Sequence, residues 1–263
     1  MLVNEVMDTL KLIVEYDGTR YAGWQRQRDQ PTIQAAIEHA LARITQSRIT
    51  VTAAGRTDAG VHAIGQVVST RVPKSLPTDV WLRALNSLLP ADIAIRHVER
   101  VSESFHARYS AVSKVYQYKI LNRPTRSALH RHRLWHLPGA LDLDAIQEAA
   151  RYFLGTQDCS SFQGSPTSNR NPLCTITRCE VTRAGAQLIV VCEADRFLKQ
   201  MVRTMVGTLM EVGTGKRRPE EILQILAAKN RCAAGKTAPP HGLYLWKVTY
   251  RNTALYSGPD SDR

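Results

Sequence analysis

The stretch Gly55-Arg56-Thr57-Asp58-Ala59-Gly60-Val61-His62-Ala63 lies between two segments in which apolar residues alternate with others, residues 49–53 and 67–71. Alternation with a period of two is typical of β-strands, so the stretch should connect two strands. Gly55 and Gly60 flank one carboxylate, and glycine permits unusual backbone angles and close approach of a ligand. The sequence therefore predicts a loop that presents Asp58.

Two interpretations of this loop remain open. Gly, Asp and Thr are the usual residues of turns, so it could be an ordinary turn. Alternatively, Arg56 lies close enough along the chain to keep the carboxylate of Asp58 ionised, ready to act as a nucleophile or base.

Patterns on both sides of the loop predict an α+β fold. A strand is expected over residues 10–16, a helix from Pro31-Thr32 with one apolar stripe, a second helix over 77–89 and a strand over 93–101. With the strands that flank the Asp58 loop, the order is β-α-β-β-α-β. This order is typical of the split βαβ, ferredoxin-like unit.

The second half is expected to repeat this scheme. It has a strand over 114–121, a helix over 143–154, a hairpin of 174–182 and 187–193, helices over 197–212 and from Pro219, and a strand over 243–250. We therefore predict two ferredoxin-like halves with antiparallel or mixed sheets, residues 8–105 and 106–253. They are expected to meet around a central basic cleft, and residues 1–7 and 254–263 should be flexible tails.

The charge balance predicts a polyanionic partner. The 35 Lys and Arg residues outnumber the 23 Asp and Glu residues, which gives a net charge of +12. Nucleic acid is the first candidate and an anionic membrane surface the second. No apolar run approaches the roughly 18 residues of a membrane span, and no signal peptide is seen. Five cysteines without a Cys-x-x-Cys pair argue against a disulfide framework or a zinc site, so a reduced, cytoplasmic setting is expected.

Two segments mix basic residues with aromatics, a combination that suits unpaired RNA. The first carries Arg20, Trp24 and Arg26; it could instead be a solvated loop with its Trp in the core. The second, residues 122–136, carries Arg123 and Arg126. Its three histidines lack a nearby carboxylate or Cys, and the arginines would repel a cation, so we expect RNA contact rather than a metal site.

The nine residues around Asp58 resemble the catalytic loop of the tRNA pseudouridine synthase A family, whose catalytic Asp would be Asp58. Three further segments are similar to motifs of that family: Phe105-His106-Ala107-Arg108 with Lys114-Val115-Tyr116, Phe197 to Gly207, and His241 to Leu245. The resemblance implies that Tyr116 is the active-site tyrosine, that Arg203 pairs with Asp58, and that Leu243 lines the base pocket. From the residues alone, Tyr116 could be strand core, Arg203 a surface or structural ion pair, and Leu243 an ordinary strand start.

The resemblance also implies an activity. It predicts an isomerase that converts uridine to pseudouridine at positions 38, 39 and 40 of the tRNA anticodon arm, as a homodimer without a cofactor. Attack at the sugar, attack at the base and abstraction of a ribose proton would all use Asp58. Residues 213–216 lack the upstream glycine of a phosphate-binding loop, so no nucleotide cofactor is expected.

Two other functions would explain part of the pattern. A non-catalytic RNA-binding protein on ferredoxin-like sheets accounts for the charge and the aromatics, but gains nothing from a carboxylate directed at phosphates. A hydrolase of N-glycosidic bonds would use Asp58, but we see no second carboxylate placed to activate water.

Overall fold

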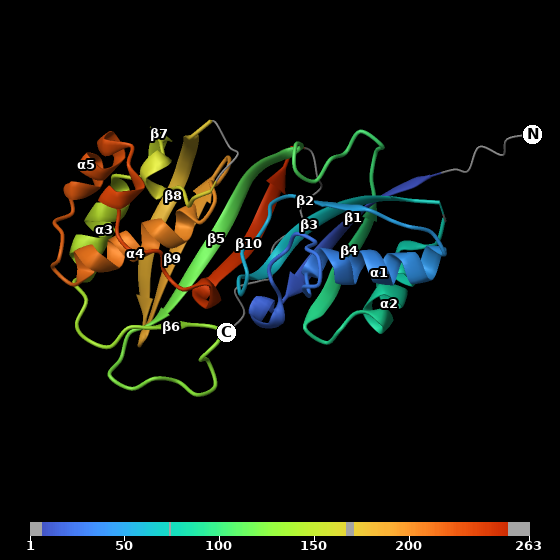
Figure 1. The fold of residues 1–263 in the computed structure, drawn as a ribbon, viewed down its shortest axis with the longest axis horizontal. Coiled ribbons are helices and arrows are strands. Elements are labelled where there is room, and N and C mark those ends of the chain that lie inside the picture. The colour runs from blue at the N-terminus through green and yellow to red at the C-terminus, as the bar shows by residue number, and fades with distance from the viewer. Residues whose placement is uncertain (1–6, 74, 167–170, 252–263) are drawn as a thin grey trace, which may run out of the picture. The chain divides into compact units, whose positions relative to one another are not determined.

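The computed structural model describes residues 7–73, 75–166 and 171–251, and in this part the chain forms two compact units (Figure 1). The first unit contains the described residues up to Val112 and those from Leu245 onward; the second is Ser113–Tyr244. The division thus falls after Val112, whereas the sequence placed it near residue 105. The expected flexible tails, residues 1–7 and 254–263, lie outside the described residues except for Met7.

The first unit has the predicted element order. It consists of β1 (Asp8–Tyr16), α1 (Ile33–Thr45), β2 (Val51–Ala53), β3 (His62–Val72), α2 (Thr78–Leu88) and β4 (Ile93–Arg100). Its strands lie in the order β4-β1-β3, with β2 paired to β3 and β10 (Leu243–Tyr250) also next to β3. The β1 strand is antiparallel to both of its neighbours.

Local signals explain these elements. The side chain of Thr32 accepts a hydrogen bond from the N–H of Ala35 and so caps α1, and Gln46 ends the helix with a φ of 56°. Ile37 and Leu41 lie one turn apart and are fully buried. Residues on both faces of β1 are buried, rather than every second one.

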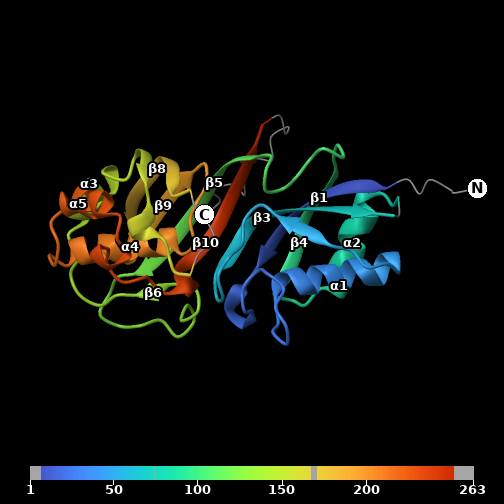
Figure 2. The same cartoon turned by 45° about the horizontal axis from the view of Figure 1, so that its top comes forward.

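The second unit is built from β5 (Ala111–Leu121, with its first residues in the first unit), β6 (Trp135–His136), α3 (Leu143–Arg151), β7 (Gly155–Asp158), β8 (Leu173–Ala184), β9 (Gln187–Ala194), α4 (Met201–Gly213) and α5 (Glu221–Ala228). Its strands lie in the order β5-β9-β8-β7, all antiparallel, while β6 runs parallel to β5. Figure 2 shows α3 and α4 on one face of this sheet.

The α4 helix begins later than predicted. Its periodicity predicted a start near Phe197, but the N–H of Met201 closes a turn on the carbonyl of Leu198, and Gln200 has a left-handed φ of 59°. From Met201 onward the helix is buried on nearly every side, and Arg203 is one of its few half-buried residues. Within the described part of the chain, no helix has the length and apolar character needed to cross a bilayer.

Candidate active site

The Asp58 loop joins β2 to β3 and is both a turn and the carrier of a carboxylate. The N–H of Val61 donates a hydrogen bond to the carbonyl of Asp58 at 3.2 Å, and Gly60 has a φ of 75°. Asp58 is half-buried, Arg56 is exposed and Thr57 is buried. The loop therefore fixes its backbone while the carboxylate keeps access to solvent.

Hydrogen bonds from three residues outside the loop hold it in place. The hydroxyl of Tyr16, at the end of β1, lies 2.8 Å from Thr57 Oγ1, and the carbonyl of Thr57 accepts from the N–H of Trp24 at 3.0 Å. The side-chain amide of Gln66 donates to the carbonyl of Gly55 at 2.8 Å. Burial raises the pKa of Tyr16 to about 12, so its hydroxyl stays protonated at neutral pH.

Two glycines let the preceding segment approach the loop closely. Gly23 has a φ of 102°, and a Cβ there would lie 2.7 Å from the carbonyl oxygen of Thr57. A Cβ on Gly18 would overlap the carbonyl of Val61. The buried His62 accepts a hydrogen bond from the N–H of Gly18 at Nδ1. Sequence reasoning did not assign these residues to the site, although both glycines follow the predicted first strand.

The structure distinguishes among the residues of the first basic segment. Trp24 is 2% exposed and its ring packs near that of Tyr16, so Trp24 is a core residue and not the exposed stacking surface that the sequence allowed. Arg20 binds Asp92 at 2.6 Å and Arg26 binds Glu38 at 3.0 Å. Their side chains are nevertheless 73% and 47% exposed, which leaves both positive charges at the surface.

In the second unit, Tyr116 lies on β5 opposite Cys192 of β9. It is buried, and its ring meets the ring of Phe197 edge-on at 5.1 Å between centroids. Such edge-to-face contact restrains the ring plane. Tyr116 is thus a packed strand residue, as the pattern of alternating aromatics allowed.

Arg203 lies in the first turn of α4 and is held by the segment that crosses that helix. Its Nε donates a hydrogen bond to the carbonyl of Ala238 at 2.8 Å, and its own carbonyl accepts from the N–H of Ala238 at 3.0 Å. A Cβ on Gly207 would overlap the carbonyl of Lys236. Burial raises the pKa of the neighbouring Tyr118, and the positive charge of Arg203 offsets part of that rise.

The remaining predicted residues differ in exposure. Leu243 is buried at the start of β10. Arg123 and Arg126 are exposed, and Arg123 donates to the carbonyls of Thr125 and Arg126, which orders the loop. Among the described residues, no three His, Cys, Asp or Glu side chains are grouped to hold a metal ion.

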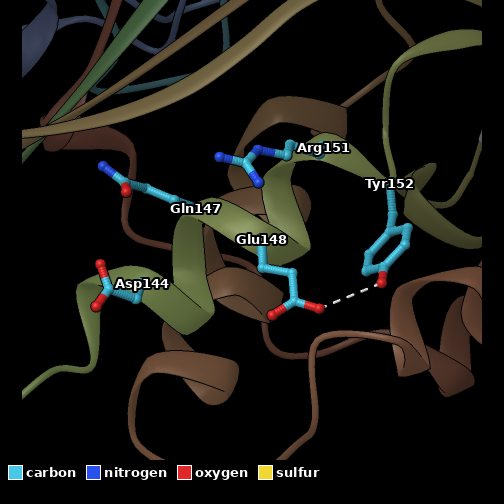
Figure 3. Close-up of a pocket in the computed structure, with 5 residues that line it drawn as sticks. All are labelled: Asp144, Gln147, Glu148, Arg151 and Tyr152. Carbon is cyan, nitrogen blue, oxygen red and sulfur yellow. Dashed lines mark hydrogen bonds between the residues drawn. The ribbon is translucent and has the colours of Figure 1, made fainter.

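A surface hollow along α3 contains none of the predicted residues. It is lined by Asp144, Gln147, Glu148, Arg151 and Tyr152 (Figure 3). The hydroxyl of Tyr152 donates to Glu148 at 3.3 Å, and the other side chains point apart along the helix. The mixed charges give the hollow no strong preference for an anion or a cation, so we assign it no chemistry.

A family model described as tRNA pseudouridine synthase matches residues 12–110 and 149–251. The chain belongs to the tRNA pseudouridine synthase family. Proteins named tRNA pseudouridine synthase A are similar to it: that of Acetivibrio thermocellus is 46% identical over 93% of this chain and 100% of the relative. Those of Bacillus pumilus and Paramagnetospirillum magneticum are 46% and 44% identical over 92% and 96% of this chain, and over 99% of each relative.

Membership of the tRNA pseudouridine synthase family confirms the predicted resemblance and the predicted isomerase class. The matched segments include Asp58, Arg203 and Leu243. Tyr116, Arg123 and Arg126 lie between them. The match itself assigns no role to any single residue.

Proposed function

We propose that this protein isomerises uridine to pseudouridine at positions 38, 39 and 40 of the tRNA anticodon stem-loop, with Asp58 as the catalytic nucleophile or base. The observation that carries the proposal is a half-buried carboxylate on a loop that hydrogen bonds from Tyr16 and Gln66 hold in place, in a chain of this family. Relatives that match nearly end to end are named for tRNA pseudouridine synthesis.

The reaction suits this residue set. The bond from the ribose to N1 of uracil breaks, a bond from the ribose to C5 forms, C5 loses a proton and N1 gains one. Nothing is oxidised, and no energy donor is consumed. A single ionised carboxylate serves attack at the sugar, attack at the base or abstraction of a ribose proton, so the proposal holds for all three routes.

Three residues of the second unit complete the proposed site. We assign Arg203 to an ion pair with Asp58, which would keep the carboxylate ionised. In support, its Nε bond to Ala238 fixes the plane of the guanidinium, and a planar cation binds carboxylates best when preorganised. Tyr116 is assigned to stacking under the flipped uracil and to proton transfer at C5, with Leu243 lining the base pocket.

RNA binding is assigned to exposed basic side chains, because the phosphate backbone supplies most of the sequence-independent affinity. Arg56 and four further arginines keep exposed charge: Arg20, Arg26, Arg123 and Arg126. A uridine within a stem must be extruded before chemistry, and these arginines would hold the deformed strand.

The proposal includes the architecture and the setting expected from the sequence. We propose that the halves of residues 8–105 and 106–253 both follow the ferredoxin-like plan around a basic cleft. The β-α-β-β-α-β order of the first unit and the antiparallel β5-β9-β8 arrangement of the second support this plan. We also propose a cytoplasmic homodimer that works without a cofactor.

One experiment separates the enzyme from an RNA-binding protein. Wild type, Asp58→Ala and Asp58→Asn are incubated with unmodified tRNA carrying labelled uridine, without cofactor, and both pseudouridine and tRNA binding are measured. We expect wild type to convert its target uridines and both variants to bind tRNA without converting it. Asp79→Asn is the matched control, because Asp79 is an exposed carboxylate of α2 in the same unit.

The alternatives give different results. If wild type binds tRNA but forms no pseudouridine, a non-catalytic RNA-binding protein is the better account. Release of free uracil would instead identify a hydrolase.

A further inference from the structure

The hydroxyl of Tyr16 contacts the residue that directly precedes Asp58. We infer that Tyr16 is a positioning residue, which sets the place of the Asp58 carboxylate through its hydrogen bond to Thr57. The inference rests on the proposed function, since it assigns a kinetic role to a contact outside the reacting groups.

The contact is buried and specific. Tyr16 is 3% exposed, and its hydroxyl lies 2.8 Å from Thr57 Oγ1 and at the limit of hydrogen bonding, 3.5 Å, from Gln66 Nε2. Water cannot easily replace a partner at this depth. Removal of the Tyr16 hydroxyl would therefore leave the buried hydroxyl of Thr57 without this hydrogen bond. The two residues are 41 positions apart, so this bond ties the end of β1 to the loop.

Thr57 is held at two atoms. Its Oγ1 is bonded to Tyr16, and its carbonyl accepts the N–H of Trp24. The carbonyl of Gly55 is bound by Gln66, and the carbonyl of Asp58 by Val61. These bonds fix the backbone on both sides of Asp58 and so set the place from which its side chain extends. Catalytic groups lose large factors in rate when displaced by about 1 Å, so the anchor at Thr57 bears on catalysis.

Tyr250 provides a matched control within the same unit. It too is buried, burial raises its pKa, and its hydroxyl donates one hydrogen bond, to the carbonyl of Ala107 at 2.7 Å. The N–H of Ala107 donates to Oγ of Ser69 in β3, seven residues beyond His62. Tyr250→Phe therefore removes a comparable buried bond that does not involve the Asp58 loop.

The test compares kinetics and stability. We expect Tyr16→Phe to lower kcat by about 10- to 100-fold with KM for tRNA changed less than about twofold. Tyr250→Phe should lower the melting temperature by a similar amount and leave kcat within about twofold of wild type. Thr57→Ser should keep the rate, and Thr57→Val should lose it. The double variant Tyr16→Phe/Thr57→Val should be no slower than the slower single variant, because both remove the same bond.

Amide hydrogen exchange supplies a readout that needs no activity. The N–H of Trp24 donates to Thr57, so Tyr16→Phe should speed exchange at Trp24 by about tenfold, while Tyr250→Phe should not. A kcat for Tyr16→Phe within about twofold of wild type, with unchanged exchange at Trp24, would overturn the inference. A wild type that forms no pseudouridine would overturn the proposed function instead, and exchange at Trp24 would still decide whether Tyr16 holds the loop.

Discussion

Arg203 and Ala238 share two hydrogen bonds, one through the guanidinium Nε of Arg203 at 2.8 Å and one through its carbonyl at 3.0 Å. The same residue therefore fixes both the helix position and the side-chain direction of Arg203. Since Ala238 uses its backbone for both bonds, the geometry depends on the course of residues 236–238 and not on the side chain at 238.

Arg203→Lys tests the importance of this geometry. The substitution keeps the positive charge but removes Nε and the planar fork. We expect pseudouridine formation to fall by about 100-fold, with the free energy of unfolding within about 1 kcal/mol of wild type. Single-turnover assays and thermal melts would measure the two quantities. Activity equal to wild type would show that charge alone suffices.

Gly207→Ala tests the crossing of residues 236–238 over α4. Because a Cβ at Gly207 would overlap the carbonyl of Lys236, we expect a loss of about 1–3 kcal/mol in unfolding free energy and reduced activity as Ala238 shifts. Gly185→Ala is the control. Gly185 has a φ of 57° but no neighbour within 4 Å of its Cβ position, so the substitution should destabilise by backbone strain and leave activity intact. A fully stable Gly207→Ala variant would contradict the packing.

Stability at high pH should report on Tyr16. Its pKa is about 12 in the folded protein, against 10.0 for an unperturbed tyrosine, because burial disfavours the phenolate. The contribution of the protonated Tyr16 to the free energy of unfolding is complete below pH 10. It is lost as the pH rises from 10 to 12, because in that range only the unfolded state releases the proton. It amounts to at most about 3 kcal/mol. Tyr16→Phe should therefore show a shallower loss of unfolding free energy over this range, and an identical slope would argue against the burial effect.

The loop of residues 122–136 should affect tRNA affinity and not chemistry. For Arg123→Gln and Arg126→Gln we expect a higher KM for tRNA, an unchanged kcat and a lower salt dependence of binding, by about one counterion per arginine. Arg178→Gln is the control, because that exposed arginine belongs to β8 and not to this loop. A variant that lowered kcat alone would place the loop in the catalytic machinery.

Thiol labelling should distinguish one exposed cysteine from four buried ones. Cys232 is exposed, whereas Cys159, Cys174, Cys179 and Cys192 are buried. The Sγ atoms of Cys179 and Cys192 lie 3.9 Å apart, and this contact with burial raises the pKa of Cys179. We expect the native protein to take up one equivalent of a thiol reagent quickly and the other four only on unfolding. Rapid labelling of several thiols would show that the second unit opens easily.

The order of the main elements could be predicted because long periodic segments carry it. The β-α-β-β-α-β order of the first unit was predicted from alternation and helical spacing alone. The two-residue β6 and four-residue β7 were not predicted, since segments so short show no period. The start of α4 was wrong by four residues, because the turn at 198–200 continues the apolar spacing of the helix.

Prediction of the candidate site from the sequence has a different limit. Asp58 could be proposed because its neighbours form a recognisable stretch, and Arg203 because its segment resembles a family motif. The bonds from Tyr16 to Thr57 and from Arg203 to Ala238 join residues 41 and 35 positions apart, and no local pattern predicts them. Trp24 shows the same limit, because alternating basic and aromatic residues look alike whether the ring is buried or exposed.

The assignment of Leu245–Tyr250 to the first unit has a consequence for synthesis on the ribosome. Those residues lie beside β3 in the sheet, and a Cβ on Gly65 would lie 2.5 Å from the carbonyl of Trp246. A growing chain therefore makes β1 to β4 early, but lacks the strand beside β3 until the whole second unit has been translated. During that interval part of the edge of β3 has no partner strand, and an unpaired edge of this kind can pair with another chain.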